Sequence, residues 1–335
     1  MLPAIKPILL LVLTTLTFIS QATPARELPP QPLSIKNQNP FIQIFGLPTT
    51  QPAILLSADR TALDIAFDTA NNSIINKVVE NEVITLDGES IRLSFTLRRA
   101  IGNHTEIGAE LPLVGHHNGI LDNFIEGWHK TLGLSNTERN QSPSNVLNYA
   151  YARDGTTVLS IQSPENGLGD IRLFGARQLH NDDRSALSLH VSLKLPTGDT
   201  NQLNGSGATD LAISTAYSHQ YSPSRWQYNA FFNGGILLLG DSDKFANIQR
   251  RSVLFGSAGI IWNATSNIDI IAQLDSHAGF YRSALDQLSN NTLQLTVGGV
   301  IHITPTTQLD IGVGENLFTD TTPDFLLNIA LKQHY

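Results

Sequence analysis

Residues 187–195 read Leu-Ser-Leu-His-Val-Ser-Leu-Lys-Leu, so an apolar side chain stands at every second position of this run. Successive side chains of a β-strand point to opposite faces, and the run therefore predicts a strand with one apolar and one polar face. The same alternation is found in residues 91–98, 106–113, 293–302 and 309–314. Two architectures use it: a soluble sandwich or barrel that is apolar inside, and an outer-membrane barrel that is apolar outside.

The lengths of the strands and connections favour the membrane barrel. Most alternating segments run for roughly ten residues, which matches the 9–11 that cross a bilayer at a tilt and exceeds the 5–6 of a typical sandwich strand. Short turns alternate with long loops along the chain, as a membrane barrel requires. The short turns lie at 102–103, 181–183, 222–224, 264–266 and 304–306, and the long loops at 115–146, 197–208, 239–250, 281–290 and 317–323.

The sequence thus predicts an all-β fold: an antiparallel up-and-down transmembrane β-barrel of twelve to fourteen strands, with one short helix in a long external loop. Counting every segment gives fourteen strands, at 60–69, 90–101, 104–114, 147–153, 156–163, 169–180, 184–196, 209–221, 225–238, 251–263, 266–280, 291–303, 306–316 and 324–335. Two alternatives stay open. The Asp154-Gly155 hairpin could belong to the preceding loop, which leaves twelve strands, and Val83 to Leu86 could pair with Ile91 to Leu97 through Asp87-Gly88.

The composition limits the classes of function. Only 15% of the 335 residues are charged, against about 25% in an ordinary soluble domain. The formal charge of −8 argues against a polybasic nucleic-acid surface. Because the chain has no cysteine, it has no disulfide scaffold and no cysteine-based metal or redox site. We expect no cofactor, no metal and no nucleic-acid partner.

The first residues have the layout of a secretory signal peptide. Lys6 precedes an apolar stretch at 8–19, and small residues then allow cleavage after Ala22 or Ala25. We expect a signal peptide at 1–22, an N-terminal periplasmic segment or plug at 23–57, and an outer-membrane barrel at 58–335 with a helical loop insertion at 115–146. This organisation predicts export to the outer membrane of a Gram-negative cell.

The long loop at 115–146 contains one helical pattern. Its apolar residues follow the spacing of a single helix face, and this face is formed by Leu121, Phe124, Ile125, Trp128 and Leu132. Such a helix either folds into the pore mouth or lies on the membrane interface, or it merely packs on the rim of the barrel.

The last strand ends in an aromatic residue and resembles the C-terminal signal by which outer-membrane barrels are recognised for assembly. Its apolar face is formed by Phe325, Leu327, Ile329, Leu331 and Tyr335, and Gln333 interrupts it. The expected partners are therefore the barrel assembly machinery, together with the outer-membrane lipids and lipopolysaccharide that would surround the barrel.

The polar faces of the strands predict a lumen with charges of both signs. The pore-lining candidates are Arg92, Arg98, Glu106, Glu110, Lys194, Asp269, Asp275, His277, His302 and Asp310. With both signs present, no ring of one sign indicates an anion or cation pore, and the charges could equally pair across a narrow lumen and fill it. We predict a porin-like passive channel or binding barrel for a small solute; the alternative is a structural or lipid-organising barrel without transport.

An outer-membrane lipase is the third and most remote hypothesis. His190 and Ser192 have the spacing of the His and Ser in known lipases of this type, but they alternate with apolar residues and should point to the lumen rather than to lipid. No third residue stands out to orient the histidine. We therefore expect that the protein is not an enzyme and has no catalytic residues.

Several motifs occur in an order that resembles the uncharacterised proteobacterial family of domain of unknown function 3187, and they cover most of the mature chain. They are Asn39-Pro40-Phe41, Gly46-Leu47-Pro48, Asp87-Gly88-Glu89, Glu110-Leu111-Pro112, residues 119–129, Gly133-Leu134, Gly167-Leu168-Gly169-Asp170 and Lys194-Leu195-Pro196-Thr197-Gly198-Asp199. Ile120 departs from the pattern, which would have a second glycine there. The later half also resembles the barrel family named for the phenol meta-degradation pathway. The resemblance implies an exported barrel and carries no substrate, reaction or catalytic residue.

Overall fold

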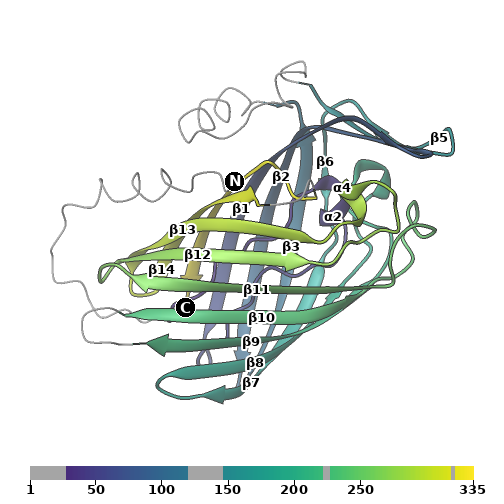
Figure 1. Cartoon of the computed structure of the whole chain (residues 1–335). Helices are drawn as coiled ribbons and strands as arrows, with labels where there is room; N and C mark the ends of the chain where they lie inside the picture. Colours follow the sequence, from purple (N-terminus) through teal and green to yellow (C-terminus); the bar gives the residue numbers. More distant parts are fainter. Residues whose placement is uncertain (1–27, 120–145, 222–226, 318–320) are drawn as a thin grey trace.

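The computed structural model describes residues 28–119, 146–221, 227–317 and 321–335, and within these ranges fifteen strands form one antiparallel sheet (Figure 1). The strands are β1 (Thr61–Val79), β2 (Glu82–Ile101), β3 (Thr105–His117), β4 (Asn148–Arg153), β5 (Thr156–Ile161), β6 (Glu165–Leu168), β7 (Arg172–Asn181), β8 (Ser185–Lys194), β9 (Asp210–Tyr221), β10 (Tyr228–Leu238), β11 (Ser252–Asn263), β12 (Ile268–His277), β13 (Thr292–Thr304), β14 (Thr307–Asn316) and β15 (Phe325–His334). The helical elements are α2 (Pro40–Gln43), the 3-10 turn η2 (Thr200–Gln202) and α4 (Asp286–Ser289).

Twelve of these strands close into a barrel, because the first and last strands pair with each other. The β1–β15 register runs from Ala62 opposite His334 to Asn71 opposite Phe325. The all-β antiparallel barrel is thus confirmed, but fourteen strands is too many. The hairpin formed by β4 and β5, together with β6, lies outside the closed wall, and the alternative of twelve strands is correct.

The hairpin considered at Asp87-Gly88 does not form. Strand β2 runs through these residues without a break, with Asp87 opposite Ser73 and Gly88 opposite Asn72 on β1. The chain turns instead between β1 and β2 at Glu80, whose φ is +52°. The local turn signal is overridden because β1 extends far enough to pair with β2 along almost its whole length.

The two ends of the barrel differ in the length of their connections. The short-turn end carries the turns after β2, β7, β9, β11 and β13, and the long-loop end carries the longer connections and the additional strands. In Figure 1, β5 projects beyond the barrel wall at the long-loop end, where α2 and α4 also lie. The described residues include no helix that is both long and apolar enough to cross a membrane. The predicted loop-helix face at 121–132 lies outside the described residues.

The outer surface of the wall is apolar. Large hydrophobic side chains that are at least 36% exposed recur around it, among them Leu97, Ile107, Leu173, Val191, Ile213, Ile260, Leu274, Ile301 and Ile311. On β15, Ile329 and Leu331 are exposed on this surface, as is Tyr335 just beyond the strand, and Leu327 is half-buried, whereas Phe325 is buried. An apolar exterior around a polar interior is the arrangement of a membrane barrel.

Residues 28–57, here called the N-terminal segment, lie inside the barrel. A first arm (28–38) runs from the short-turn end to α2 at the long-loop end, and a second arm (46–57) returns to the short-turn end. Asn39 caps α2 by accepting a hydrogen bond from the Phe41 amide, and Pro40 occupies the first helical position, which suits a residue without an amide hydrogen.

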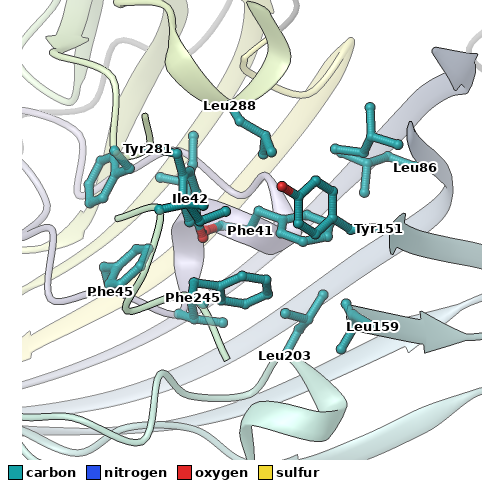
Figure 2. Close-up of a cluster of buried hydrophobic side chains, with 14 of the residues drawn as sticks. Phe41, Ile42, Phe45, Leu86, Tyr151, Leu159, Leu203, Phe245, Tyr281 and Leu288 are labelled. Carbon is teal, nitrogen blue, oxygen red and sulfur yellow. The ribbon is translucent and has the colours of Figure 1, made fainter. Parts of the chain in front are cut away.

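An aromatic cluster holds α2 at the long-loop end (Figure 2). Phe41 contacts Tyr151 and Phe245 edge-on, with ring centroids 6.1 and 5.5 Å apart, and Phe45 stacks on Phe280 at 5.1 Å. Tyr281 donates a hydrogen bond to the Phe41 carbonyl at 2.6 Å. Burying each such ring contributes roughly 1.5–3 kcal/mol. The turn of the N-terminal segment is therefore its most firmly packed part.

Candidate functional site

The lumen is the candidate site, and the structure places all ten predicted pore-lining residues on the inner side of the wall. Nine are buried and Asp275 is half-buried. Most of them belong to ion pairs between neighbouring strands. The charges therefore pair along the wall, and it is the N-terminal segment that fills the space between its sides.

One buried cluster joins β2, β3 and β7. Glu110 accepts from Arg92 at 2.6 Å with one carboxylate oxygen and from Arg172 with the other. The guanidinium of Arg172 also lies over the ring of Phe174, 5.7 Å from its centroid. Two cations thus share one carboxylate in this cluster.

Two further clusters have the opposite balance. Near the long-loop end, the Lys194 ammonium lies 2.5 Å from Asp170 and 3.3 Å from Asp210. Near the short-turn end, Arg98 lies 3.4 Å from Asp64 and 3.5 Å from Glu106. In each case one cation serves two carboxylates, and the cluster around Glu110, in which one carboxylate serves two cations, lies between them.

The remaining candidates line the other side of the lumen. Lys332 pairs with Asp310 at 2.8 Å, and Asp269 contacts His302 at 3.0 Å. His277 and Asp275 contact the N-terminal segment instead. His277 is hydrogen-bonded to Asn37, and the Asp275 carboxylate accepts from Thr50 at 2.8 Å.

The first arm of the N-terminal segment is bound by a wall glutamine. Gln273 accepts from the Leu33 amide at 3.1 Å and donates to the Leu33 carbonyl at 3.2 Å, and so imitates the pairing of a neighbouring strand. The Leu33 side chain fits against Gly298 and Gly312, where a Cβ atom would come within 3.0 Å of it. These glycines leave the space that the arm occupies.

The second arm is bound in the same way from the opposite wall. Gln178 accepts from the Leu55 amide and donates to the Ala53 carbonyl, both at 2.9 Å. Asn233 donates to the Gln51 carbonyl at 2.8 Å, and Glu106 accepts from the Leu56 amide at 3.1 Å. The wall thus binds the backbone of the N-terminal segment mainly through single side chains.

Sequence reasoning missed several residues of this site. Asp64 and Asp68 alternate with Ile65 and Phe67 inside a predicted strand, so the period of two could have identified them. Asp210 lies near the start of the predicted strand 209–221, where it was not expected to line the lumen, yet it begins β9 and is buried against Lys194. No sequence pattern indicates that the wall glutamines Gln178 and Gln273 bind the backbone of the N-terminal segment.

The geometry around His190 does not form a catalytic pair with Ser192. The imidazole contacts the Ser188 hydroxyl at 2.8 Å and the Pro52 carbonyl of the second arm at 3.2 Å. Both His190 and Ser192 are buried on the inner face, away from the lipid-facing surface where a lipase would meet its substrate. Within the described ranges, no group of histidine and acidic side chains has the arrangement of a metal site.

A cavity of about 830 Å³ opens at the short-turn end, between the ends of the two arms and the turns. Its lining includes Leu28, Leu56 and Asp182. Asp182 accepts hydrogen bonds from the amides of Arg184 and Ser185, and these bonds hold the pKa of its carboxyl well below the usual value. This vestibule lies between the short turns and the N-terminal segment, which fills the lumen towards the long-loop end.

Comparisons with known proteins support the fold. The family model described as "protein of unknown function (DUF3187)" matches residues 8–335. A comparison with curated proteins gives no match. The structure is similar to the crystal structure of the COG4313 outer membrane channel from Pseudomonas putida F1, with a TM-score of 0.54, 14% identity, and coverage of 84% of this chain and 97% of that chain.

Two other solved structures are less similar. The CymD monoaromatic hydrocarbon channel gives a TM-score of 0.37 at 11% identity, with 90% of this chain and 93% of that chain covered. The Pseudomonas putida toluene transporter TodX gives 0.35 at 10% identity, with 84% and 90% covered. At such low identity the similarity to the COG4313 channel establishes an outer-membrane barrel fold and nothing about the solute.

Proposed function

The chain belongs to the DUF3187 family of proteins of unknown function, and we propose that it is a passive outer-membrane channel or binding barrel for a small solute, closed by its N-terminal segment. The observation that carries this proposal is the way the segment is held. Its only charged residue is Lys36, and its bonds to the wall are mostly hydrogen bonds between single wall side chains and its backbone.

Such a segment can leave without breaking the ion pairs of the wall. A solute would then enter a lumen lined by charges of both signs and diffuse down its gradient. The vestibule at the short-turn end, which faces the periplasm in this proposal, gives the segment a space into which it can withdraw. Residues 1–22 are the signal peptide in this proposal, and lipids and lipopolysaccharide contact the exposed apolar belt.

A disulfide lock tests the role of the segment. The hydroxyl oxygens of Thr50, on the second arm, and Ser257, on β11, lie 3.0 Å apart, so cysteines at these positions face each other as a disulfide requires. The natural chain has no cysteine, and Thr50→Cys/Ser257→Cys therefore contains a single pair of thiols. The two single variants are the matched controls.

The purified protein is placed in planar bilayers and its current is recorded before and after reduction. We expect discrete conductance steps in the reduced double variant and in both single variants, and their loss when the double variant is oxidised. Equal conductance in the oxidised and reduced forms would show that the segment does not close the lumen.

The occupied lumen favours a second candidate, a structural or lipid-organising barrel without transport. In that case the N-terminal segment is a permanent core, and its aromatic cluster at the long-loop end serves stability alone. Bilayers that stay silent with the reduced double variant and with a variant lacking residues 116–146 would support this candidate and reject the channel.

A further inference from the structure

A second cavity, of about 60 Å³, lies between the two arms of the N-terminal segment and the wall. Its lining includes Lys36 from the first arm, Arg92 and Arg172 from β2 and β7, and the carboxylates of Asp68 and Glu110. The volume exceeds the roughly 10–15 Å³ that one water molecule needs by the same kind of measure. A small polar group of several atoms can therefore occupy it.

The cations around this cavity are incompletely paired. Lys36 is 8% exposed and lines the cavity, and within the described parts of the chain its ammonium makes no hydrogen bond or ion pair. Within the same ranges, the buried Nε of Arg172 donates to no acceptor. A buried cation is expensive unless an anion pairs with it.

The nearby carboxylates are already in use. Glu110 is shared by Arg92 and Arg172, and Asp68 accepts from the Asn328 amide at 2.7 Å. Arg98, Lys332 and Asp64 also line the cavity. Both of these cations have carboxylate partners of their own, Asp64 and Glu106 for Arg98 and Asp310 for Lys332. Within the described ranges, Lys36 is thus the lining cation that no carboxylate pairs with.

We infer that this cavity is a binding site for a small monoanion of the carboxylate class, held between Lys36 of the N-terminal segment and the guanidinium groups of Arg92 and Arg172. The bound anion accepts hydrogen bonds from Lys36 and from the free Nε of Arg172. It links the segment to the wall, so its binding also stabilises the segment in the lumen. This inference is independent of whether the barrel conducts.

Formate is a suitable probe because of its size. Its binding to the full-length barrel in detergent is followed by broadening of the formate proton resonance, with gluconate keeping the ionic strength constant. The test variant is Lys36→Met, which removes the charge, and the matched control is Lys77→Met, at an exposed position. A charge-assisted hydrogen bond contributes enough for its loss to weaken binding about tenfold or more.

A second measurement separates binding from misfolding. The temperature at which the folded band is lost in heat-modifiable gel migration should rise with formate concentration in the wild type and in Lys77→Met. It should not respond to formate in Lys36→Met, whether or not that variant is less stable overall. The proposed site would be overturned if the wild-type barrel neither broadened the formate resonance nor gained thermal stability. It would also be overturned if Lys36→Met showed both effects as strongly as the wild type. Bilayer currents play no part in either measurement, so this failure differs from a failure of the channel proposal.

Discussion

Gln273 should decide how often the N-terminal segment leaves the wall. Its amide exchanges two hydrogen bonds with the Leu33 backbone, at 3.1 and 3.2 Å, and it is completely buried. Gln273→Ala removes both bonds, and also the hydrogen bonds of the same amide group to Thr50 on the second arm and to Asp275 on its own strand. At about 1 kcal/mol net for each of the two bonds to Leu33, the first arm loses about 2 kcal/mol. The population of the displaced segment should then rise about 30-fold, since 1.4 kcal/mol is a factor of ten.

A cysteine in the first arm reports that population. Gln38 is 1% exposed and neither of its side-chain polar atoms has a hydrogen-bond partner within the described residues, so Gln38→Cys removes no hydrogen bond and supplies the only thiol of the chain. Its labelling by a membrane-impermeant maleimide requires the arm to move. When closing is fast, the labelling rate follows the population of the open form.

The control for this experiment is Gln308→Ala, a buried inward-facing glutamine whose amide bonds to Asp310 on its own strand. Gln38→Cys/Gln273→Ala should be labelled about 30-fold faster than Gln38→Cys, and the combination with Gln308→Ala should stay close to the parent rate. If both combinations were labelled at the same rate, the two hydrogen bonds of Gln273 would not be what holds the arm.

Two predictions concern the wall. Glu110→Ala should lower the free energy of unfolding by about 3–5 kcal/mol, because Arg92 and Arg172 lose their shared carboxylate. Urea unfolding measures this loss, and Asp183→Ala, at an exposed position, is the control whose unfolding free energy should change little. Ile329 lies on the outer surface of β15, and Ile329→Arg should lower the free energy of unfolding in a bilayer by about 2–4 kcal/mol if the position lies near the bilayer midplane. The folded fraction in lipid vesicles measures this effect, and undiminished folding would contradict a lipid-facing β15.

The strands could be predicted from the sequence because burial on one side imposes a period of two. Ile91, Leu93 and Leu97 alternate with Arg92 and Arg98, and this fixes which side chains face the lumen without knowledge of the neighbouring strand. The short turns follow from the same pattern, because the alternation stops at them. Features that depend only on a residue and its near neighbours in the chain, such as the strands, the short turns and the inward-facing side chains, could therefore be predicted from the sequence.

The number of barrel strands depends on distant pairing and could not be settled in this way. The β4–β5 hairpin has the same alternation and turn residues as a barrel hairpin, but it pairs with the part of β2 that extends beyond the wall. Asp87-Gly88 is a strong local turn signal, and β1 nevertheless keeps it extended. In both cases the partner strand, rather than the local sequence, determines the outcome.

The N-terminal segment was the least predictable part of the site. Its proline-rich start reads as a flexible tail, and nothing in its sequence indicates which wall it contacts. Gln178 and Gln273 bind its backbone, yet each looks like any inward-facing polar residue of a strand. The interaction joins backbone groups of the N-terminal segment to isolated side-chain amides of the wall strands. Neither partner therefore has a sequence pattern from which the contact could be predicted.

The distribution of charge gives a physical reason why the N-terminal segment can be displaced from the lumen. Breaking a buried ion pair by taking away one partner costs about 3–5 kcal/mol, because it leaves an unpaired buried charge. Glu110, Lys194 and Arg98 avoid that penalty because their partners are on the wall itself. The segment adds one charge, Lys36. Its other contacts are apolar packing and hydrogen bonds, which contribute about 1 kcal/mol each between neutral groups and about 1.5–3 kcal/mol each where the wall partner is an ionisable group, as in the bonds to Glu106, Asp210 and Lys194. Withdrawal therefore leaves the ion pairs of the wall unbroken, and the main resistance comes from the aromatic cluster around Phe41, where we expect opening to be limited.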